Sequence, residues 1–139
     1  MAAAAGALVL NIGTLSTPWI EAMLLAGKPG SRRELAERIH ALGPAAVIVT
    51  GGHGAEPVDH FFDGYEHLEI SVPRYSKLAT HGAGCTHSAA LTALLAKGLP
   101  LREAAEEAAR IASQAVANGL EWLGAGEGPV DVLGLEEQE

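Results

Sequence analysis

The residues best suited to chemistry lie in one short stretch, Thr80-His81-Gly82-Ala83-Gly84-Cys85-Thr86, directly before an apolar run. The pattern predicts that a helix begins at this point. The N-terminus of a helix carries unsatisfied backbone N–H groups and a partial positive charge, and both attract anions. Gly82 and Gly84 leave the backbone open to a ligand because they carry no side chain. We therefore expect Gly82, Ala83 and Gly84 to bind phosphate, with Cys85 at the mouth of the site.

Cys85 is the candidate general base, since phosphoryl transfer to an alcohol requires a group that accepts the hydroxyl proton. Other interpretations stay open. Glycines before a helix often form a tight turn that binds no ligand. A lone cysteine on an apolar helix is often a small buried residue. His81 and Cys85 can form a nucleophilic pair, although no third residue orients them. A metal site at His53, His81 and His87 matches no zinc spacing, so no metal ligand is expected in the chain.

A second glycine-rich motif, Thr50-Gly51-Gly52-His53, follows a β-branched run that predicts a buried strand. In open α/β sheets, ligands bind outside the carboxyl ends of the strands. We therefore expect Thr50, Gly51, Gly52 and His53 to contact phosphate or nucleotide. A third glycine-rich stretch covers residues 124–128. Convergence of the three stretches on one cleft would suit a nucleoside triphosphate, because glycines let backbone amides approach the phosphates.

The remaining pattern predicts an α/β fold that positions these motifs. Apolar runs at 7–12 and 46–50 are typical of strands buried on both faces. A helix that begins at the capping box Ser31 to Glu34 lies between them, which predicts a parallel strand–helix–strand unit. Apolar runs at 58–62 and 67–72 flank Asp63-Gly64 and indicate a β-hairpin. Further helices are expected over residues 19–26, 86–97 and 101–118, and the apolar 86–97 helix is expected to be central and buried.

Length and composition restrict the class of protein. The chain has 139 residues, which suits a single domain. Its formal net charge of −8 argues against binding of nucleic acid, which requires a basic surface. The apolar runs are shorter than a membrane span, and the single cysteine excludes an intrachain disulfide. These features favour a cytoplasmic protein, and they leave a nucleotide ligand open, since such a ligand needs only a local positive pocket.

Three motifs together resemble the C-terminal part of hydroxymethylpyrimidine and phosphomethylpyrimidine kinases. They are Thr50-Gly51-Gly52-His53, the stretch from Thr80 to Ala90, and Gly126-Glu127-Gly128-Pro129-Val130. The resemblance covers residues 31–133 and implies a partial ribokinase-like fold, with a mostly parallel sheet, flanking helices and a β-hairpin. It also implies that Gly82 to Cys85 form an anion hole with Cys85 in the position of the catalytic base.

The N-terminal stretch, residues 6–28, resembles a segment of hydroxyethylthiazole kinase, a thiamine-pathway kinase of the same fold. The chain is thus expected to form one truncated ribokinase-like domain over residues 1–139, with a junction near residues 28–30. Full-length members of both families are about twice as long, by what the resemblance implies. Thr50 also stands where the pyrimidine kinases usually have a phosphate-contacting lysine.

The resemblance implies ATP-dependent phosphorylation of hydroxymethylpyrimidine or its phosphate, with Mg²⁺ as the accompanying ion. Two alternatives remain: a non-catalytic module that binds nucleotide or phosphate or mediates dimerisation, and an activity like that of hydroxyethylthiazole kinase. A half-sheet would leave an unpaired strand edge and apolar surface, so a homo-oligomer is expected.

Overall fold

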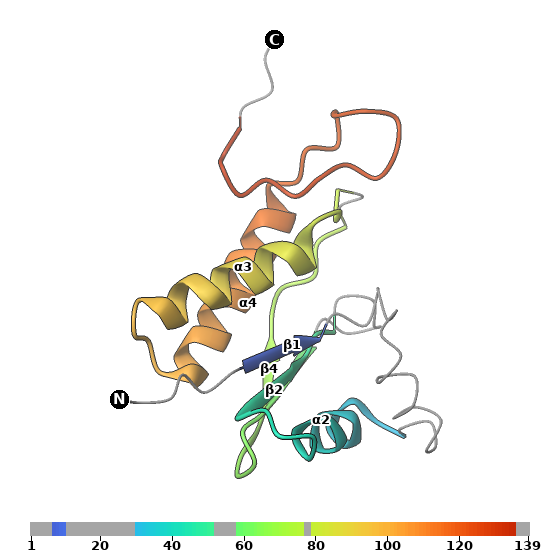
Figure 1. Cartoon of the computed structure of the whole chain (residues 1–139). Helices are drawn as coiled ribbons and strands as arrows, with labels where there is room; N and C mark the ends of the chain where they lie inside the picture. Colours follow the sequence, from blue (N-terminus) through green and yellow to red (C-terminus); the bar gives the residue numbers. More distant parts are fainter. Residues whose placement is uncertain (1–6, 11–29, 52–57, 77–78, 136–139) are drawn as a thin grey trace. The chain divides into compact units, whose positions relative to one another are not determined.

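The computed structural model describes residues 7–10, 30–51, 58–76 and 79–135 (Figure 1). These residues fall into two compact units, Met1–Ser71 and Val72–Glu139, and each is described by itself. No helix within the described ranges is both long enough and apolar enough to cross a membrane.

The first unit contains a four-stranded sheet with the strands in sequence order. Its strands are β1 (Ala7–Leu10), β2 (Ala46–Val49), β3 (Val58–Phe62) and β4 (His67–Ser71). β1 pairs with β2 in parallel, whereas β2–β3 and β3–β4 are antiparallel pairs. The predicted parallel unit and the predicted hairpin are therefore confirmed. The hairpin turn is fixed by the Asp63 carboxylate, which accepts hydrogen bonds from the N–H groups of Tyr65 and Glu66 at 2.9 and 2.8 Å.

Helix α2 (Arg32–His40) packs on this sheet (Figure 1). Ser31 caps it, since its hydroxyl accepts the Glu34 N–H at 3.1 Å. Glu34 reaches back to the Gly30 N–H at 2.7 Å, one residue before the cap, so the predicted capping box is present with a shifted second bond. The apolar side of α2 meets β2 in a buried cluster that comprises Leu35, Ala36, Ile39, Val47 and Val49. This cluster forms because every β2 residue is buried and α2 presents its apolar side chains at helical spacing.

The second unit is built on α3 (Ala83–Ala96) and α4 (Leu101–Ala117), which lie side by side (Figure 1). Gly98, with φ of 88°, supports the turn between them. The buried residues of α4 all have small side chains, which lets the two helices approach closely. They are Ala104, Ala105, Ala108, Ala109, Ala112, Ser113 and Ala115.

Helix α3 differs from the sequence-based expectation in two ways. It begins at Ala83, three residues before the expected start at residue 86. Its buried residues are His87 and Leu91, so it is not buried on all sides as predicted. Alanine is the strongest helix former and is tolerated in water, so an alanine-rich helix does not require complete burial.

Candidate functional site

The start of α3 has the geometry of an anion site. Gly82 is the N-cap, with a left-handed φ of 91°, and its lack of a side chain leaves the helix without a side-chain cap. The Ala83 N–H donates to the Thr80 carbonyl at 3.2 Å, and the Thr86 N–H donates to the Gly82 carbonyl at 2.8 Å. Among the described residues, the N–H groups of Gly84 and Cys85 have no acceptor. Two donors at the positive end of a 14-residue helix are thus available to a ligand.

The third glycine-rich stretch ends beside this helix start. The His81 N–H donates to the Gly128 carbonyl at 3.2 Å, and the Val130 N–H donates to the His81 carbonyl at 2.9 Å. These bonds form a short parallel bridge between His81 and Pro129. The Thr80 hydroxyl also donates to the Glu127 carboxylate. The chain before Gly82 is therefore held by the C-terminal segment on both backbone and side-chain atoms.

Two glycines, Gly128 and Gly119, lie where two backbone segments of this region approach too closely for a side chain to fit between them. A Cβ at Gly128 would lie 2.3 Å from the Leu120 carbonyl oxygen. A Cβ at Gly119 would lie 2.6 Å from the Ala79 carbonyl oxygen. Both distances are shorter than any real Cβ contact, so a larger residue at either position would displace the segment that supports the α3 start.

Cys85 lies in the first turn of α3 and is exposed. The interpretation of Cys85 as a small buried core residue is therefore wrong. The neighbouring Gly84 carbonyl accepts a hydrogen bond from the Ser88 hydroxyl at 3.0 Å, so the carbonyl side of this turn is satisfied. Within the described ranges, no three His, Cys, Asp or Glu side chains gather where they could hold a metal ion. His53, one of the three histidines considered as metal ligands, lies outside the described residues.

The strand-end motif is only partly described: Thr50 and Gly51 are included, whereas Gly52 and His53 lie outside the described residues. Gly51 is buried, and a Cβ there would lie 2.1 Å from the Val58 carbonyl oxygen. Its N–H donates to Asp59 Oδ1 at 2.8 Å. The Gly51 amide is thus already engaged within the protein. Convergence of this motif with the α3 start stays a prediction.

Sequence reasoning missed Asp59, a residue of β3 that is 8% exposed. Strand β3 alternates between buried and partly buried positions, and Asp59 shares its buried face with Phe61. The sequence did carry a signal for this residue: the alternating pattern of the strand assigns position 59 to the core, where an acidic side chain is unusual. The partner, Gly51, is eight residues earlier in the chain, so the pattern alone could not identify it.

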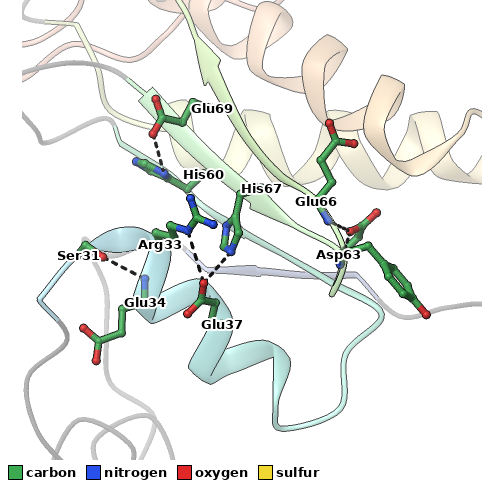
Figure 2. Close-up of polar contacts among 10 residues, drawn as sticks. Ser31, Arg33, Glu34, Glu37, His60, Asp63, Glu66, His67 and Glu69 are labelled. Atoms are coloured by element: carbon green, nitrogen blue, oxygen red, sulfur yellow. Dashed lines mark hydrogen bonds and ion pairs between the residues drawn. The ribbon is translucent and has the colours of Figure 1, made fainter.

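A second polar cluster lies between α2 and the hairpin (Figure 2). Glu37 of α2 accepts a hydrogen bond from His67 Nε2 at 2.8 Å and pairs with Arg33 Nε at 3.5 Å. His60 Nδ1 lies 3.9 Å from Glu69 Oε1. Burial lowers the pKa of His60 because it disfavours the charged imidazolium, although the nearby Glu69 carboxylate opposes this shift. The His67–Glu37 contact joins α2 to β4, and the His60–Glu69 contact joins β3 to β4. These contacts give the cluster a structural role.

Comparison with known proteins identifies a family of kinases to which the chain is similar. A family profile described as phosphomethylpyrimidine kinase matches residues 2–131. The hydroxymethylpyrimidine/phosphomethylpyrimidine kinase of Rhizobium meliloti is 40% identical over 132 residues, or 88% of this chain and 49% of that protein. The Bacillus subtilis enzyme of the same name is 41% identical over 103 residues, or 72% of this chain and 38% of that protein.

Solved structures agree in fold. The pyridoxal kinase of Staphylococcus aureus in complex with ADP superposes with a TM-score of 0.76 at 30% identity, covering 91% of this chain and 47% of that one. A ribokinase from Thermotoga maritima superposes with a TM-score of 0.63 at 23% identity, which supports the ribokinase-like fold. The chain spans half or less of the length of each of these relatives. The profile match includes residues 6–28, whose likeness to hydroxyethylthiazole kinase stays a prediction.

Proposed function

The chain belongs to the phosphomethylpyrimidine kinase family, and we propose that it uses ATP to phosphorylate hydroxymethylpyrimidine or its monophosphate. The observation that carries the proposal is the start of α3, where a left-handed glycine cap leaves the N–H groups of Gly84 and Cys85 without acceptors in the described part of the chain. Such an arrangement stabilises the negative charge of a transferring phosphoryl group.

The proposal assigns the phosphates to two segments. Gly82, Ala83 and Gly84 form the anion hole, together with the Cys85 amide. The Thr50 to His53 segment supplies a second contact; there Gly51 contributes a close backbone approach and not its own amide, which is bonded to Asp59. An ADP complex of the related Staphylococcus pyridoxal kinase supports the use of a nucleotide by this fold.

Cys85 is the proposed general base for phosphoryl transfer from ATP to the alcohol substrate. The hydroxyl oxygen attacks the γ-phosphorus of ATP, and the hydroxyl proton moves to Cys85 Sγ, which accepts it as the thiolate and becomes the neutral thiol. The bond from the γ-phosphorus to the β–γ bridging oxygen breaks, and ADP leaves with that oxygen. The exposure of Cys85 in the first turn of α3 supports this role, because the sulfur is accessible at the same helix end as the open amides.

Mg²⁺ is proposed as the ion that arrives with ATP and neutralises phosphate charge. In kinase sites this ion is held by one or two carboxylates together with the substrate phosphates. No residue is assigned to it here, since the described residues contain no cluster of three suitable side chains.

A pyridoxine-like alcohol is the second candidate substrate. The pyridoxine kinase of Bacillus subtilis is 45% identical over 74 residues, or 51% of this chain, and several of the similar solved structures are pyridoxal kinases. The anion hole acts on the nucleotide and does not select between a pyrimidine, a pyridine and a thiazole alcohol. The hydroxyethylthiazole activity implied by the N-terminal resemblance is tested in the same assay.

A coupled ADP-release assay on the full chain tests the activity. Hydroxymethylpyrimidine, its monophosphate, pyridoxal and hydroxyethylthiazole are each supplied with ATP and Mg²⁺. Turnover with one of the pyrimidines supports the proposal, and turnover with pyridoxal or the thiazole alone reassigns the substrate. ADP binding without turnover on any of them favours the non-catalytic nucleotide-binding module, for which the absence of a lysine before Gly51 is the motivating observation.

Self-association is proposed because large apolar side chains of the second unit are exposed, among them Trp122 at 47% and Leu133 at 82%. Light scattering on the purified chain should give a mass at least twice the 14.3 kDa of one copy. A mass of one copy at high concentration would contradict it.

A further inference from the structure

We propose that Glu127 is a positioning residue for the nucleotide phosphates, and that its contact with Thr80 determines which amides at the start of α3 stay open. This inference rests on the proposed function of that helix start. Glu127 acts through Thr80 and does not itself contact the ligand. The two residues are 47 positions apart in the sequence, and both belong to the second unit.

A short path of bonds joins the Glu127 carboxylate to the first turn of α3. The Thr80 hydroxyl donates to Glu127 Oε1, and the Thr80 carbonyl accepts the Ala83 N–H at 3.2 Å. This second bond engages the first amide of the helix, so the open donors in the described chain begin at Gly84. A change in the orientation of Thr80 would release the Ala83 amide and alter the direction of the donors that follow it.

The backbone next to Thr80 is held by the same C-terminal segment. His81 donates its N–H to the Gly128 carbonyl at 3.2 Å, and its carbonyl accepts the Val130 N–H at 2.9 Å. Glu127 directly precedes Gly128 and adds a side-chain bond one residue before this bridge. Residues 121–127 are exposed and Gly128 is buried, so Glu127 is the point at which the exposed loop is joined to the supported chain.

The charge of Glu127 makes a purely electrostatic role distinguishable from a positioning role. A carboxylate close to an anion site repels phosphate, so its removal should tighten nucleotide binding if charge alone matters. Loss of the hydrogen bond to Thr80 should instead weaken binding, because the first turn is no longer pre-organised for the ligand. The two effects have opposite signs in the same measurement.

The test titrates ADP into variants of the full chain by calorimetry. Glu127→Ala removes the acceptor, Glu127→Gln retains an acceptor oxygen without the charge, and Thr80→Val removes the donor. Glu106→Ala is the matched control, since Glu106 is an exposed carboxylate of the same unit, paired with Arg102 at 3.3 Å, and its loss changes the net charge equally. Melting temperatures establish that each variant is folded, and hydrogen exchange at the Ala83 amide reports the helix start directly.

Glu127→Ala and Thr80→Val should each weaken ADP binding by about fivefold, the factor expected for one net hydrogen bond, and should accelerate Ala83 exchange. The double variant should bind within about twofold of either single variant, because both remove the same interaction. Glu127→Gln should bind within about twofold of the wild type or more tightly, and Glu106→Ala should bind within about twofold of the wild type.

Unchanged or tighter ADP binding by Glu127→Ala, unchanged Ala83 exchange in that variant, or an equal loss of affinity in Glu127→Gln or Glu106→Ala would overturn the role. Losses that add in the double variant would overturn it as well. A wild-type chain that binds no ADP overturns the proposed function. That failure is distinguishable from the others, since each of them requires that the wild type binds ADP.

Discussion

Cys85 follows the glycine pair, and the structure shows it exposed in the first turn of α3. A thiol in a core would be protected from reactants, whereas this one is accessible at the helix end where two amides lack acceptors in the described chain. This accessibility supports the proposed role of Cys85 as the base.

Replacement of Cys85 by alanine should lower kcat by about 10²–10⁴-fold, the range for loss of a general base. ADP affinity should stay within about threefold, because the Cys85 amide remains in place. Steady-state kinetics and calorimetry on the same preparation measure both quantities. An unchanged kcat would contradict the assignment of the base, and a large loss of ADP affinity would indicate a structural role.

His60 makes the first unit sensitive to acid. Burial lowers its pKa from the usual 6.5, so the unfolded chain binds this proton more readily than the folded chain. Stability should therefore decrease as the pH falls below about 6.5 and level off below the folded-state pKa. The carboxyls of Glu34, Asp63 and Glu107, whose pKa values are lowered mainly by hydrogen bonds, lose their stabilising effect only near and below their own ordinary values of 4.5, 3.8 and 4.5.

A His60→Gln variant should lose less stability than the wild type between about pH 7 and about pH 5, since it has no imidazole to protonate. Urea unfolding at several pH values measures the difference. At about pH 8 His60 is neutral in both states, so any difference there gives the pH-independent effect of the substitution. Parallel curves for the two proteins below pH 6.5 would contradict the role of His60.

At the scale of elements, helix α3 offers a matched pair of glycines. Gly82 at its start and Gly98 after its end have φ values of 91° and 88°, and an added Cβ meets nothing closer than 3.6 Å at the first and nothing within 4 Å at the second. Alanine at either position should therefore cause backbone strain of about 1–2 kcal/mol without a steric clash. Only Gly82 borders the open amides.

Gly82→Ala and Gly98→Ala should lower the melting temperature by similar amounts. Gly82→Ala alone should weaken ADP binding, by about tenfold or about 1.4 kcal/mol, because strain at the cap reorients the first turn. Thermal unfolding and calorimetry measure the two effects. Equal ADP affinity in the two variants would show that the cap conformation does not matter for the ligand.

The strands and the hairpin could be predicted because their signals are local. Residues 47–49 are β-branched and apolar, and Asp63-Gly64 marks the turn whose amides Asp63 binds. The start of α3 was placed three residues late, because glycines at positions 82 and 84 disfavour a helix by propensity. The bridge from His81 to the segment at Gly128 and Val130 fixes the chain there, and such a contact between distant residues is not visible in a local pattern.

The candidate site was predictable to the same extent. The glycine loop and Cys85 follow from residue types at a helix start. The contact of Asp59 with the Gly51 N–H could not be predicted, because it depends on the antiparallel register that brings β3 beside the end of β2. Thr80 and Glu127 likewise meet only through folding, since 47 positions separate them.

At the scale of the molecule, the described residues form two compact units. The α3 start and its C-terminal support belong to the second unit, whereas Gly51 and Asp59 belong to the first. The chain spans 49% of its Rhizobium relative and 38% of its Bacillus relative. Nucleotide binding at the α3 start can be tested independently of turnover.

The central claim, that the start of α3 binds the phosphates of a nucleotide, is tested most directly by titrating the full chain with ATP while its backbone amides are observed by NMR. The account predicts saturable shifts of the Gly84 and Cys85 amides with one common dissociation constant, and no comparable shift at Gly98 beyond the far end of the helix. Amides of Gly84 and Cys85 that stay unchanged at saturating ATP would contradict it.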